Sequence, residues 1–259
     1  MTLPAPSDGF YWAIEPWGAA LRCAALDGVS AHLFTTRALT LQPGGAPSDG
    51  WTALAASLGV AEPDVVRLKQ VHGCAVIPVE RGSDEPSPLV RREADVLVSN
   101  DPARAIVVQA ADCVPVLLAD PVTGLVAAAH AGWRGTAARA VVAAVEALIS
   151  RGARPADLIA AIGPSIGLCC YEVGEELRDG FRADGHPEAD LARWFTQEPG
   201  AKPHLNLPRA NRDQLVAAGL REVNVHACGL CTACHLDVFY SFRREAAQVG
   251  RLAAGIRAL

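Results

Sequence analysis

The sequence predicts an α/β fold, a single domain in which mixed β-sheets are flanked by helices. Short apolar runs of β-type composition alternate along the chain with segments whose apolar residues recur at helical spacing. Hydrophobic residues make up 51% of the 259 positions and charged residues 20%, which suits a large core. No internal repeat, low-complexity linker or clear boundary divides the chain. We therefore expect one domain that spans residues 1–259.

Strands are predicted where short, mostly apolar runs lie between turn signals. They are Phe10–Ile14, Val29–Arg37, the beginning of Asp64–Gly73, Ala94–Ser99, Ala105–Ala110, Val114–Ala119, Leu125–Ala129, Leu158–Ile162 and Glu222–His226. Helices are predicted where apolar residues follow the helical period, often up to a glycine that ends the helix. They are Trp51–Leu58, Thr136–Ser150, Tyr171–Ala183 and Pro208–Ala218. The Gly-, Pro- or charge-rich segments between them are expected to be loops: Ala38–Gly50, Glu80–Pro88 and Asp184–Pro203.

Two of these strands, Val114–Ala119 and Leu125–Ala129, form a predicted β-hairpin around the turn signal Asp120-Pro121-Val122-Thr123-Gly124. A type I turn over Asp120–Thr123 pairs Cys113 with His130. If Gly124 joins the loop, His130 pairs with Pro115 instead. Both registers place the Cys113 thiol and the His130 imidazole on one face, whereas a slip by one residue would separate them.

The bulk properties favour a cytoplasmic protein that does not bind nucleic acid. The formal net charge is -5, and no cluster of lysine and arginine is dense enough for a nucleic-acid groove. No apolar run reaches the roughly 18 residues of a membrane helix. The N-terminal segment has no basic flank or long apolar core, so we expect no signal peptide, and the eight cysteines should stay reduced. We expect a monomer or a homodimer.

Three residues at the ends or edges of predicted strands, His72, Cys113 and His130, are the candidate metal ligands. Imidazole and thiolate are preferred zinc ligands, and three of them leave a fourth tetrahedral position open. One alternative is that the three residues have no catalytic role: a buried small cysteine and two ordinary histidines. Another is a Cys–His nucleophilic pair. Two histidines around one cysteine favour one zinc ion, although such a site can also take copper.

The neighbours of these residues suggest how the site would work. Asp112, next to Cys113, could support a metal ligand or carry a proton. The glycine-rich turn after His130 leads into a predicted helix, so the Gly132–Thr136 amides are placed to bind an anion. The cationic side chains near these stretches, which together suit a phosphate or carboxylate, are Arg37, Lys69, Arg134 and Arg243.

A second cluster of possible ligands is Cys228-x2-Cys231-x2-Cys234-His235. Its spacing is typical of a metal knuckle or an iron–sulfur run, but both need a further ligand. Cys169-Cys170 could supply one, although adjacent residues in a strand point in opposite directions. The alternative is a set of reduced structural thiols.

Several motifs in a fixed order resemble the laccase-domain family, whose members have been called multicopper polyphenol oxidases and zinc-dependent purine nucleoside phosphorylases. The motifs are Leu68-Lys69-Gln70-Val71-His72-Gly73, Ala111-Asp112-Cys113-Val114-Pro115, His130-Ala131-Gly132-Trp133-Arg134-Gly135-Thr136, Ile162-Gly163-Pro164-Ser165-Ile166-Gly167, Cys169-Cys170-Tyr171-Glu172-Val173, Cys231-Thr232 and Tyr240-Ser241-Phe242-Arg243-Arg244. The resemblance extends from about Val29 to near the C-terminus. In Ala38–Gly50 the chain departs from the family pattern, so substrate contacts from that segment are not expected to follow it.

The resemblance implies a zinc site formed by His72, Cys113 and His130, and activity on purine nucleosides. The implied reactions are phosphorolysis of adenosine, inosine and methylthioadenosine, and deamination of adenosine. We expect Asp112, Cys113 and Arg134 to be catalytic. The expected substrate-binding residues are Arg37, Lys69, Gln70, Gly132 and Arg134. Cys228 and Cys234 look like additions to the family pattern, which favours structural thiols for that cluster.

Two other functions compete with this one. A true multicopper oxidase needs many clustered histidines, and the seven in this chain are mostly without partners, so we rank oxidase activity low. A zinc or cysteine amidohydrolase that edits cell-wall peptide precursors is the second enzyme class, and a non-catalytic partner protein is the third. In the favoured hypothesis, deamination uses a water whose pKa zinc lowers and which attacks C6 of the purine. In phosphorolysis, cationic side chains hold the phosphate that approaches C1′.

Overall fold

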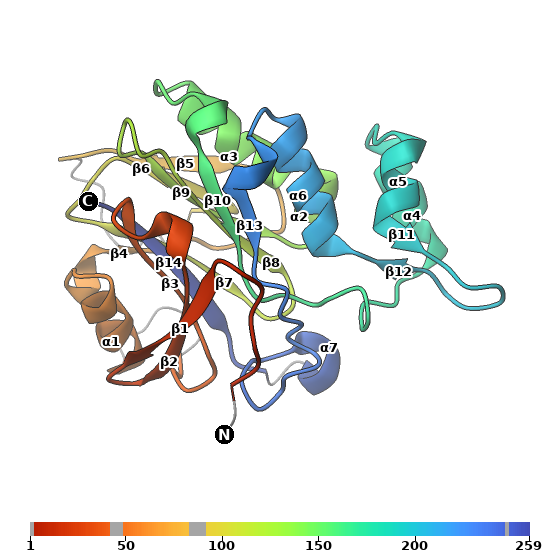
Figure 1. Cartoon of the computed structure of the whole chain (residues 1–259), viewed down its shortest axis with the longest axis horizontal. Coiled ribbons are helices and arrows are strands. Elements are labelled where there is room, and N and C mark those ends of the chain that lie inside the picture. Colours follow the sequence, from red (N-terminus) through yellow and green to blue (C-terminus); the bar gives the residue numbers. More distant parts are fainter. Residues whose placement is uncertain (1–2, 42–48, 83–91, 247–248) are drawn as a thin grey trace.

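The computed structural model describes residues 3–41, 49–82, 92–246 and 249–259, and it confirms a mixed α/β fold. Two six-stranded sheets lie face to face, and helices cover their outer sides (Figure 1). The first sheet has the order β1 (Phe10–Glu15), β2 (Gly18–Cys23), β3 (Ser30–Thr35), β14 (Leu252–Ala258), β7 (Ala105–Ala110) and β4 (Val65–Val66). The second has the order β13 (Val225–Ala227), β10 (Ile159–Ile162), β8 (Val114–Ala119), β9 (Val126–Ala131), β6 (Val96–Ser99) and β5 (Val76–Val79).

Seven α-helices and one short ribbon complete the described part of the chain. The helices are α1 (Asp49–Ser57), α2 (Trp133–Ala137), α3 (Ala140–Ile149), α4 (Glu175–Ala183), α5 (Glu188–Trp194), α6 (Leu207–Ala217) and α7 (Phe242–Glu245). Strands β11 (Phe195–Thr196) and β12 (His204–Leu205) pair with each other. No helix in the described ranges combines the length and apolar character needed to cross a membrane.

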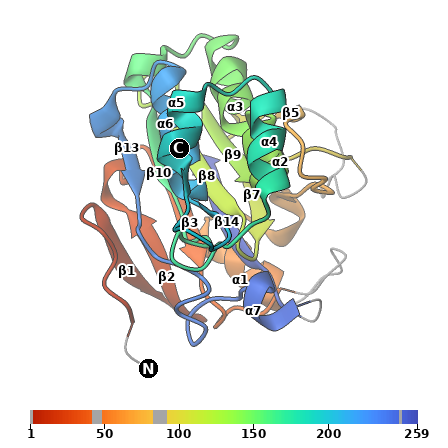
Figure 2. The ribbon, with the colours of Figure 1, turned by 90° about the vertical axis from the view of Figure 1, so that its right-hand side faces the viewer.

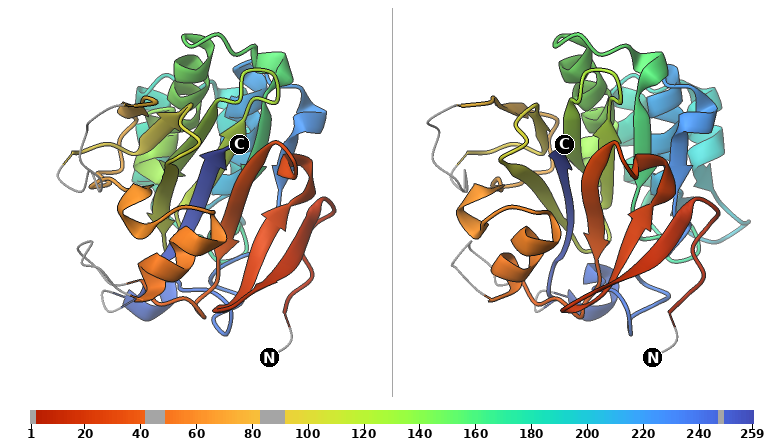
Figure 3. Two further views of the ribbon diagram at one scale, coloured as in Figure 1. Left: turned by 90° about the vertical axis from the view of Figure 1, so that its left-hand side faces the viewer. Right: turned by 60° about the vertical axis from the view of Figure 1, so that its left-hand side comes forward.

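Side-chain alternation along the strands separates three apolar layers. Between the sheets, Ile106 of β7 packs with Leu117 of β8 and Ala128 of β9. The outer face of the first sheet packs against α1 (Figure 3), and that of the second packs against α3 and α6. Figure 2 looks onto α4 and α5, which lie beside α6. A residue's position in its strand therefore decides which layer it enters.

The β8–β9 hairpin adopts the register in which Gly124 belongs to the loop. Pro115 pairs with His130 and Val114 with Ala131. Gly124 has φ 73°, a conformation that glycine adopts without steric cost, and its N–H donates to the Asp120 carbonyl over 2.9 Å. His130 and its partner Pro115 consequently point into the layer between the sheets. Cys113 lies two residues before Pro115 and therefore has the same orientation.

The single helix predicted over Thr136–Ser150 is wrong. Helix α2 ends at Ala137 and α3 begins at Ala140, because Arg139 between them is left-handed with φ 61°. In a continuous helix the Thr136 carbonyl would accept the Ala140 N–H. Here the Gln214 side chain of α6 donates to that carbonyl over 2.9 Å. Tertiary packing thus satisfies the backbone at the break.

The loop predicted over Asp184–Pro203 is also wrong, since it contains α5 and β11. Trp194 is buried beside Phe181, with ring centroids 6.1 Å apart, and its indole N–H donates to Asp213 over 3.0 Å. Conversely, the helix predicted from Tyr171 begins only at Glu175, because Glu172 forms a bridge with His204.

Three other segments differ in extent. In Glu222–His226 the first residues form a 3-10 turn, and β13 begins at Val225. Residues 42–48 of the expected loop Ala38–Gly50 lie outside the described residues, and Asp49 and Gly50 begin α1. Residues 83–88 of Glu80–Pro88 also lie outside them.

Candidate functional site

The three predicted ligands meet at one end of the layer between the sheets. Cys113 directly precedes β8, His130 lies in β9, and His72 lies in the connection from β4 of the first sheet to β5 of the second. One ligand atom from each residue lies within 4.8 Å of the others. His130 is buried and His72 is exposed, so the group lies between the core and solvent. The structure therefore brings together residues that are far apart in the sequence.

Asp95, which we did not predict, organises this group. It is fully buried just before β6, and its carboxylate accepts the Nδ1–H of His130 over 2.8 Å. The same carboxylate accepts the backbone N–H groups of Val71, His72 and Gly73 at 3.2, 2.9 and 2.7 Å. One side chain thus orients the imidazole in β9 and fixes the loop that carries His72. A buried acidic residue needs such partners, and its position before an apolar strand was the available signal.

The backbone at the site takes conformations that are unusual for residues other than glycine. His72 has φ 62° and Asp112 has φ 85°. Each such residue costs of order 1–3 kcal/mol and persists only where its surroundings hold it. The Asp95 carboxylate holds the His72 backbone, and the Ile166 N–H binds the Asp112 carbonyl over 2.9 Å.

Gly132 allows the ligands to approach one another. A Cβ atom at this position would lie 2.8 Å from the Cys113 sulfur and 3.0 Å from Cδ2 of His72. Both distances are shorter than a normal contact, so Cys113 and His72 would have to move if residue 132 had a side chain. Gly132 therefore contributes to the site through the space that it leaves open.

Hydrogen bonds among three ionisable groups of the site shift their pKa values. Burial alone would raise the pKa of Cys113, but hydrogen bonds from His130 and His72 outweigh it and lower the pKa to about 6. Burial would lower the pKa of His130, but its hydrogen bonds to Asp95 and Cys113 raise it to about 9. Burial would likewise raise the pKa of Asp95, yet bonds from His130 and Gly73 hold it below the usual range. Both shifts favour an ion pair between the His130 imidazole and the Cys113 thiol, and a bound metal would replace the proton that the two groups share.

These residues fit a metal ion such as zinc. Because Nδ1 of His130 donates to Asp95, Nε2 is the nitrogen left for a metal, an arrangement common among histidine ligands. Two imidazoles and one thiolate are a sufficient zinc ligand set with one open position.

Two cavities reach the group, and both are lined by His72, Cys113, Ala111 and Phe242. The first is about 370 Å³, and its other lining residues are Leu68, Gln70, Gln109, Ala110, His130 and Arg251. The second is about 310 Å³ and is also lined by Asp112, Trp133, Arg134, Ile166, Tyr171, Leu207 and Arg243. Both volumes lie within the range of small-molecule sites, about 300–1,000 Å³.

Asp112 lines the second cavity, but its carboxylate mainly contacts the C-terminal segment. It accepts the hydroxyl of Thr232 over 2.6 Å, the hydroxyl of Ser241 over 3.1 Å and the N–H of Arg243 over 2.6 Å. Asp95 rather than Asp112 supports a metal ligand directly. Asp112 joins the loop of Cys113 to the segment that leads into α7.

The predicted substrate-binding residues fall into two groups. Arg134 is exposed at the second cavity and stacks 4.2 Å from the centroid of the Trp133 ring. Gln70 lines the first cavity and exchanges hydrogen bonds with the Gln109 backbone at 2.7 and 2.8 Å.

Lys69 and Arg37 belong to the second group and do not line either cavity. Lys69 pairs with Glu93 over 2.7 Å on the surface. Arg37 pairs with Glu245 over 2.8 Å and also donates to the Leu236 carbonyl. The Gly132–Thr136 amides were expected to bind an anion at the start of a long helix. The helix that begins there, α2, has only five residues, and the Thr136 N–H already donates to the Gly132 carbonyl.

Aromatic side chains of the cavity walls were missed as well. Phe242 is 54% exposed and lies in the lining of both cavities. Tyr171 lines the second cavity, where burial, together with the charge of Cys113, raises its pKa to about 12. Both lie in motifs that the resemblance singled out, which was the signal that could have identified them.

Two similar proteins have names of enzymes that act on purine nucleosides. It is 42% identical over 203 residues to the purine nucleoside phosphorylase of Deinococcus radiodurans, covering 78% of this chain and 74% of that one. It is 37% identical over 213 residues to adenosine deaminase RL5 from an unknown prokaryotic organism, covering 80% of each.

Solved structures and a family model also match the chain. The hypothetical protein YfiH of Bacillus licheniformis superposes with a TM-score of 0.85 at 28% identity, over 96% of this chain and 99% of that one. YlmD of Geobacillus stearothermophilus gives 0.82 at 30% identity, over 92% and 96%. Residues 25–258 match the model of one family, so the chain belongs to the family described as multi-copper polyphenol oxidoreductase laccase.

Proposed function

We propose that this protein is a zinc-dependent purine nucleoside phosphorylase that acts on adenosine, inosine and methylthioadenosine and also deaminates adenosine. The observation that carries the proposal is the group of His72, Cys113 and His130, which lies open between two cavities of small-molecule size. The names of the relatives, a phosphorylase and an adenosine deaminase, support the substrate class.

In this proposal His72, Cys113 and His130 hold one zinc ion, and copper can occupy the same ligands. The ion supplies Lewis acidity at the point where the two cavities meet. Asp95 keeps the Nδ1 proton on His130 and the loop of His72 in place, so the ligand set is preorganised.

Phosphorolysis transfers C1′ of the ribose from N9 of the base to a phosphate oxygen, and the base leaves with a proton on nitrogen. Arg134 is our principal phosphate ligand, because it lines the second cavity and no carboxylate in the described part of the chain pairs with it. Gly132 lets the Cys113 and His72 side chains approach each other, and Gln70 shapes the first cavity. Lys69 lies between the lining residues Leu68 and Gln70, but its charge is paired with Glu93.

Arg37 acts indirectly in this scheme. Its partner Glu245 is the last residue of α7, and the α7 residues Phe242 and Arg243 line the second cavity. Arg37 thereby positions the cavity wall that faces the substrate.

Deamination replaces the amino group at C6 with an oxygen from water, so a proton moves from water to the departing ammonia. Asp112 is our candidate for this transfer, because it is a carboxylate in the lining of the second cavity. The hydroxyl protons of Thr232 and Ser241 are directed at it and keep it positioned beside Cys113. Tyr171, Trp133 and Phe242 provide aromatic surface for the purine.

The proposal is tested by incubating zinc-loaded protein with adenosine, with and without inorganic phosphate, and separating the products by chromatography. We expect adenine and ribose 1-phosphate only when phosphate is present, and inosine in both cases. Inosine and methylthioadenosine are assayed in the same way, and Cys113→Ala protein is the control. No turnover of any nucleoside, together with cleavage of a muramyl-type amide, would replace the proposal by an amidohydrolase.

The placement of the histidines bears on the oxidase alternative. In the described ranges, two groups of three or more potential metal ligands occur, and only one contains histidine. Of the remaining histidines, His32 and His186 are buried and bound to backbone groups elsewhere. These positions do not form the histidine-rich copper cluster of a multicopper oxidase, so the family's descriptive name does not set the reaction that we propose.

A further inference from the structure

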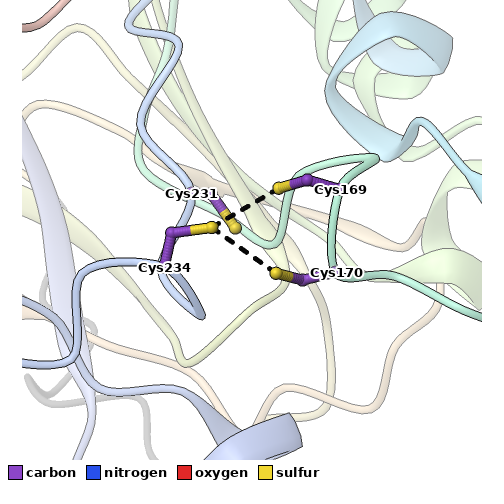
Figure 4. Close-up of side chains that lie close together, drawn as sticks. All are labelled: Cys169, Cys170, Cys231 and Cys234. Carbon is purple, nitrogen blue, oxygen red and sulfur yellow. Dashed lines mark hydrogen bonds between the residues drawn. The ribbon is translucent and has the colours of Figure 1, made fainter.

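A second potential metal site lies outside the catalytic group. The sulfur atoms of Cys169, Cys170, Cys231 and Cys234 lie within 4.8 Å of one another (Figure 4). Cys228, which the spacing had grouped with Cys231 and Cys234, is buried and does not belong to the cluster. All eight cysteines of the chain are free thiols. We propose that these four cysteines bind a zinc ion that holds two loops of the active site together.

The distances suit a single tetrahedral ion. With a Zn–S length of about 2.3 Å, the sulfurs of a tetrahedral site are about 3.8 Å apart. The Cys234 sulfur lies 3.5 Å from those of Cys169 and Cys170. A four-iron cluster would need to fit between its ligands and would hold them farther apart. The compact group therefore favours one zinc ion.

The local backbone explains how adjacent cysteines can act together. Cys169 and Cys170 lie in a turn and not in a strand, so the objection that their side chains must diverge does not apply. The N–H of Cys170 donates to the Gly167 carbonyl over 3.0 Å. Cys231 and Cys234 form a C-x-x-C turn in which the N–H of Cys234 donates to the Cys231 carbonyl over 3.2 Å.

Groups around the sulfurs stabilise thiolate charge. The N–H of Gly167 donates to the Cys231 sulfur over 3.2 Å, and Nη2 of Arg244 lies 3.8 Å from the Cys170 sulfur. A Cβ on Gly167 would lie 3.4 Å from the Cys169 sulfur and 3.2 Å from Cβ of Cys231, so glycine permits the close approach. Four bound thiolates would carry four negative charges, and a divalent cation together with Arg244 would offset three of them.

The site is connected to the catalytic centre through the residues beside its ligands. Thr232, within the C-x-x-C turn, donates to Asp112 next to Cys113. Tyr171, directly after Cys170, lines the second cavity. The pairing of Ser165 with Cys231 aligns the two loops, and zinc would cross-link them at this point. Full ligation by four protein sulfurs leaves no position for substrate, so the role is structural.

Metal content and cobalt spectra test the proposal on the full-length protein, expressed with zinc and purified without chelators. We expect two zinc ions per chain in the wild type and one in Cys234→Ser. Cys113→Ala should also hold one, and Cys228→Ala, a matched cysteine outside the cluster, should keep two. Cobalt-loaded Cys113→Ala should show the intense visible bands of tetrahedral tetrathiolate cobalt, and Cys234→Ser should lose them.

Thermal unfolding adds a readout that does not depend on turnover. Cys234→Ser should melt about 5 °C or more below Cys228→Ala, a shift that corresponds to the loss of a stabilising ligand. Cys169→Ser serves as a second variant if Cys234→Ser does not fold. One zinc ion per wild-type chain with Cys234→Ser unchanged would overturn the proposal. A Cys169–Cys234 or Cys170–Cys234 disulfide that persists in the presence of a reducing agent would also overturn it. Iron with inorganic sulfide at these cysteines would do the same.

Discussion

The two groups of potential metal ligands differ in how they relate to the core. His72, Cys113 and His130 lie at the end of the layer between the sheets, where the buried Asp95 fixes them and two cavities approach them. The four cysteines lie on two turns nearer the surface, and Cys169 and Cys234 are exposed. Three ligands with an open position suit catalysis, whereas four identical ligands suit structure. The two groups thus differ mainly in their surroundings, because cavities reach one and two turns carry the other.

Removing one ligand from each group in turn gives the largest expected contrast. Cys113→Ala should abolish both phosphorolysis and deamination, because it removes a ligand from the open site. Cys234→Ser should keep measurable turnover at low temperature, because Cys234 contacts neither cavity. The measurement is product formation from adenosine at a temperature well below the melting point. Equal loss in both variants would show that the two groups are not separable.

The role of Asp95 gives the next largest effect. Asp95→Asn removes the charged acceptor of His130 and of three backbone N–H groups, and we expect a loss of about 10–100-fold in zinc affinity or activity. Asp120→Asn is a matched control, since Asp120 is equally buried but serves the distant hairpin turn. Competition with a chelator measures the affinity. If Asp120→Asn weakened zinc binding as much, Asp95 would have no special role.

Gly132 tests whether space alone matters at the open site. The Cβ in Gly132→Ala would lie 2.8 Å from the Cys113 sulfur and would displace it, and a shift near 1 Å can cost about 100-fold in rate. Gly180→Ala in α4 is the control, because nothing lies within 4 Å of its added Cβ. Kinetics and metal content of both variants should be compared. Full activity in Gly132→Ala would mean that Cys113 can move without consequence.

Arg134 should affect one reaction and spare the other. Arg134→Ala removes a charged phosphate ligand, which is worth about 1.5–3 kcal/mol, so KM for phosphate should rise about tenfold or more. Deamination, which needs no phosphate, should change little. Arg154→Ala, an exposed arginine paired with Asp157, is the control. A parallel decrease in both reactions would assign Arg134 a general structural role.

The smallest effect to measure is the ionisation of Cys113 in metal-free protein. Its pKa is lowered to about 6, so alkylation by iodoacetamide should be slow below that pH and reach its full rate above it. An ordinary thiol reaches its full rate only at higher pH, and Cys228, whose pKa burial raises to about 12, should stay unreactive. Peptide mass spectrometry reports each site separately, and added zinc should protect Cys113. Alkylation that followed an ordinary thiol would contradict the imidazolium–thiolate pair.

Much of the fold follows from local patterns in the chain. Strands β7 and β8 have the predicted ends, because apolar runs between turn signals leave few alternatives. The break at Arg139 could not be predicted, since Gln214 and His186, whose side chains take the freed carbonyls of Thr136 and Ala137, come from distant segments. Helix α5 was missed because its buried Leu191 and Trp194 are few among charged residues.

The sequence by itself determined that Cys113 and His130 would share a face, because strand alternation and a short turn permit only a few registers. The position of His72 at the end of another predicted strand added the third candidate ligand. Tertiary structure alone decided that Asp95 would hold both histidine segments, because that contact joins a loop between the sheets to the edge of a buried strand. It also decided that Cys169 and Cys170 meet Cys231 and Cys234, since pairing between distant loops has no local signature in the chain.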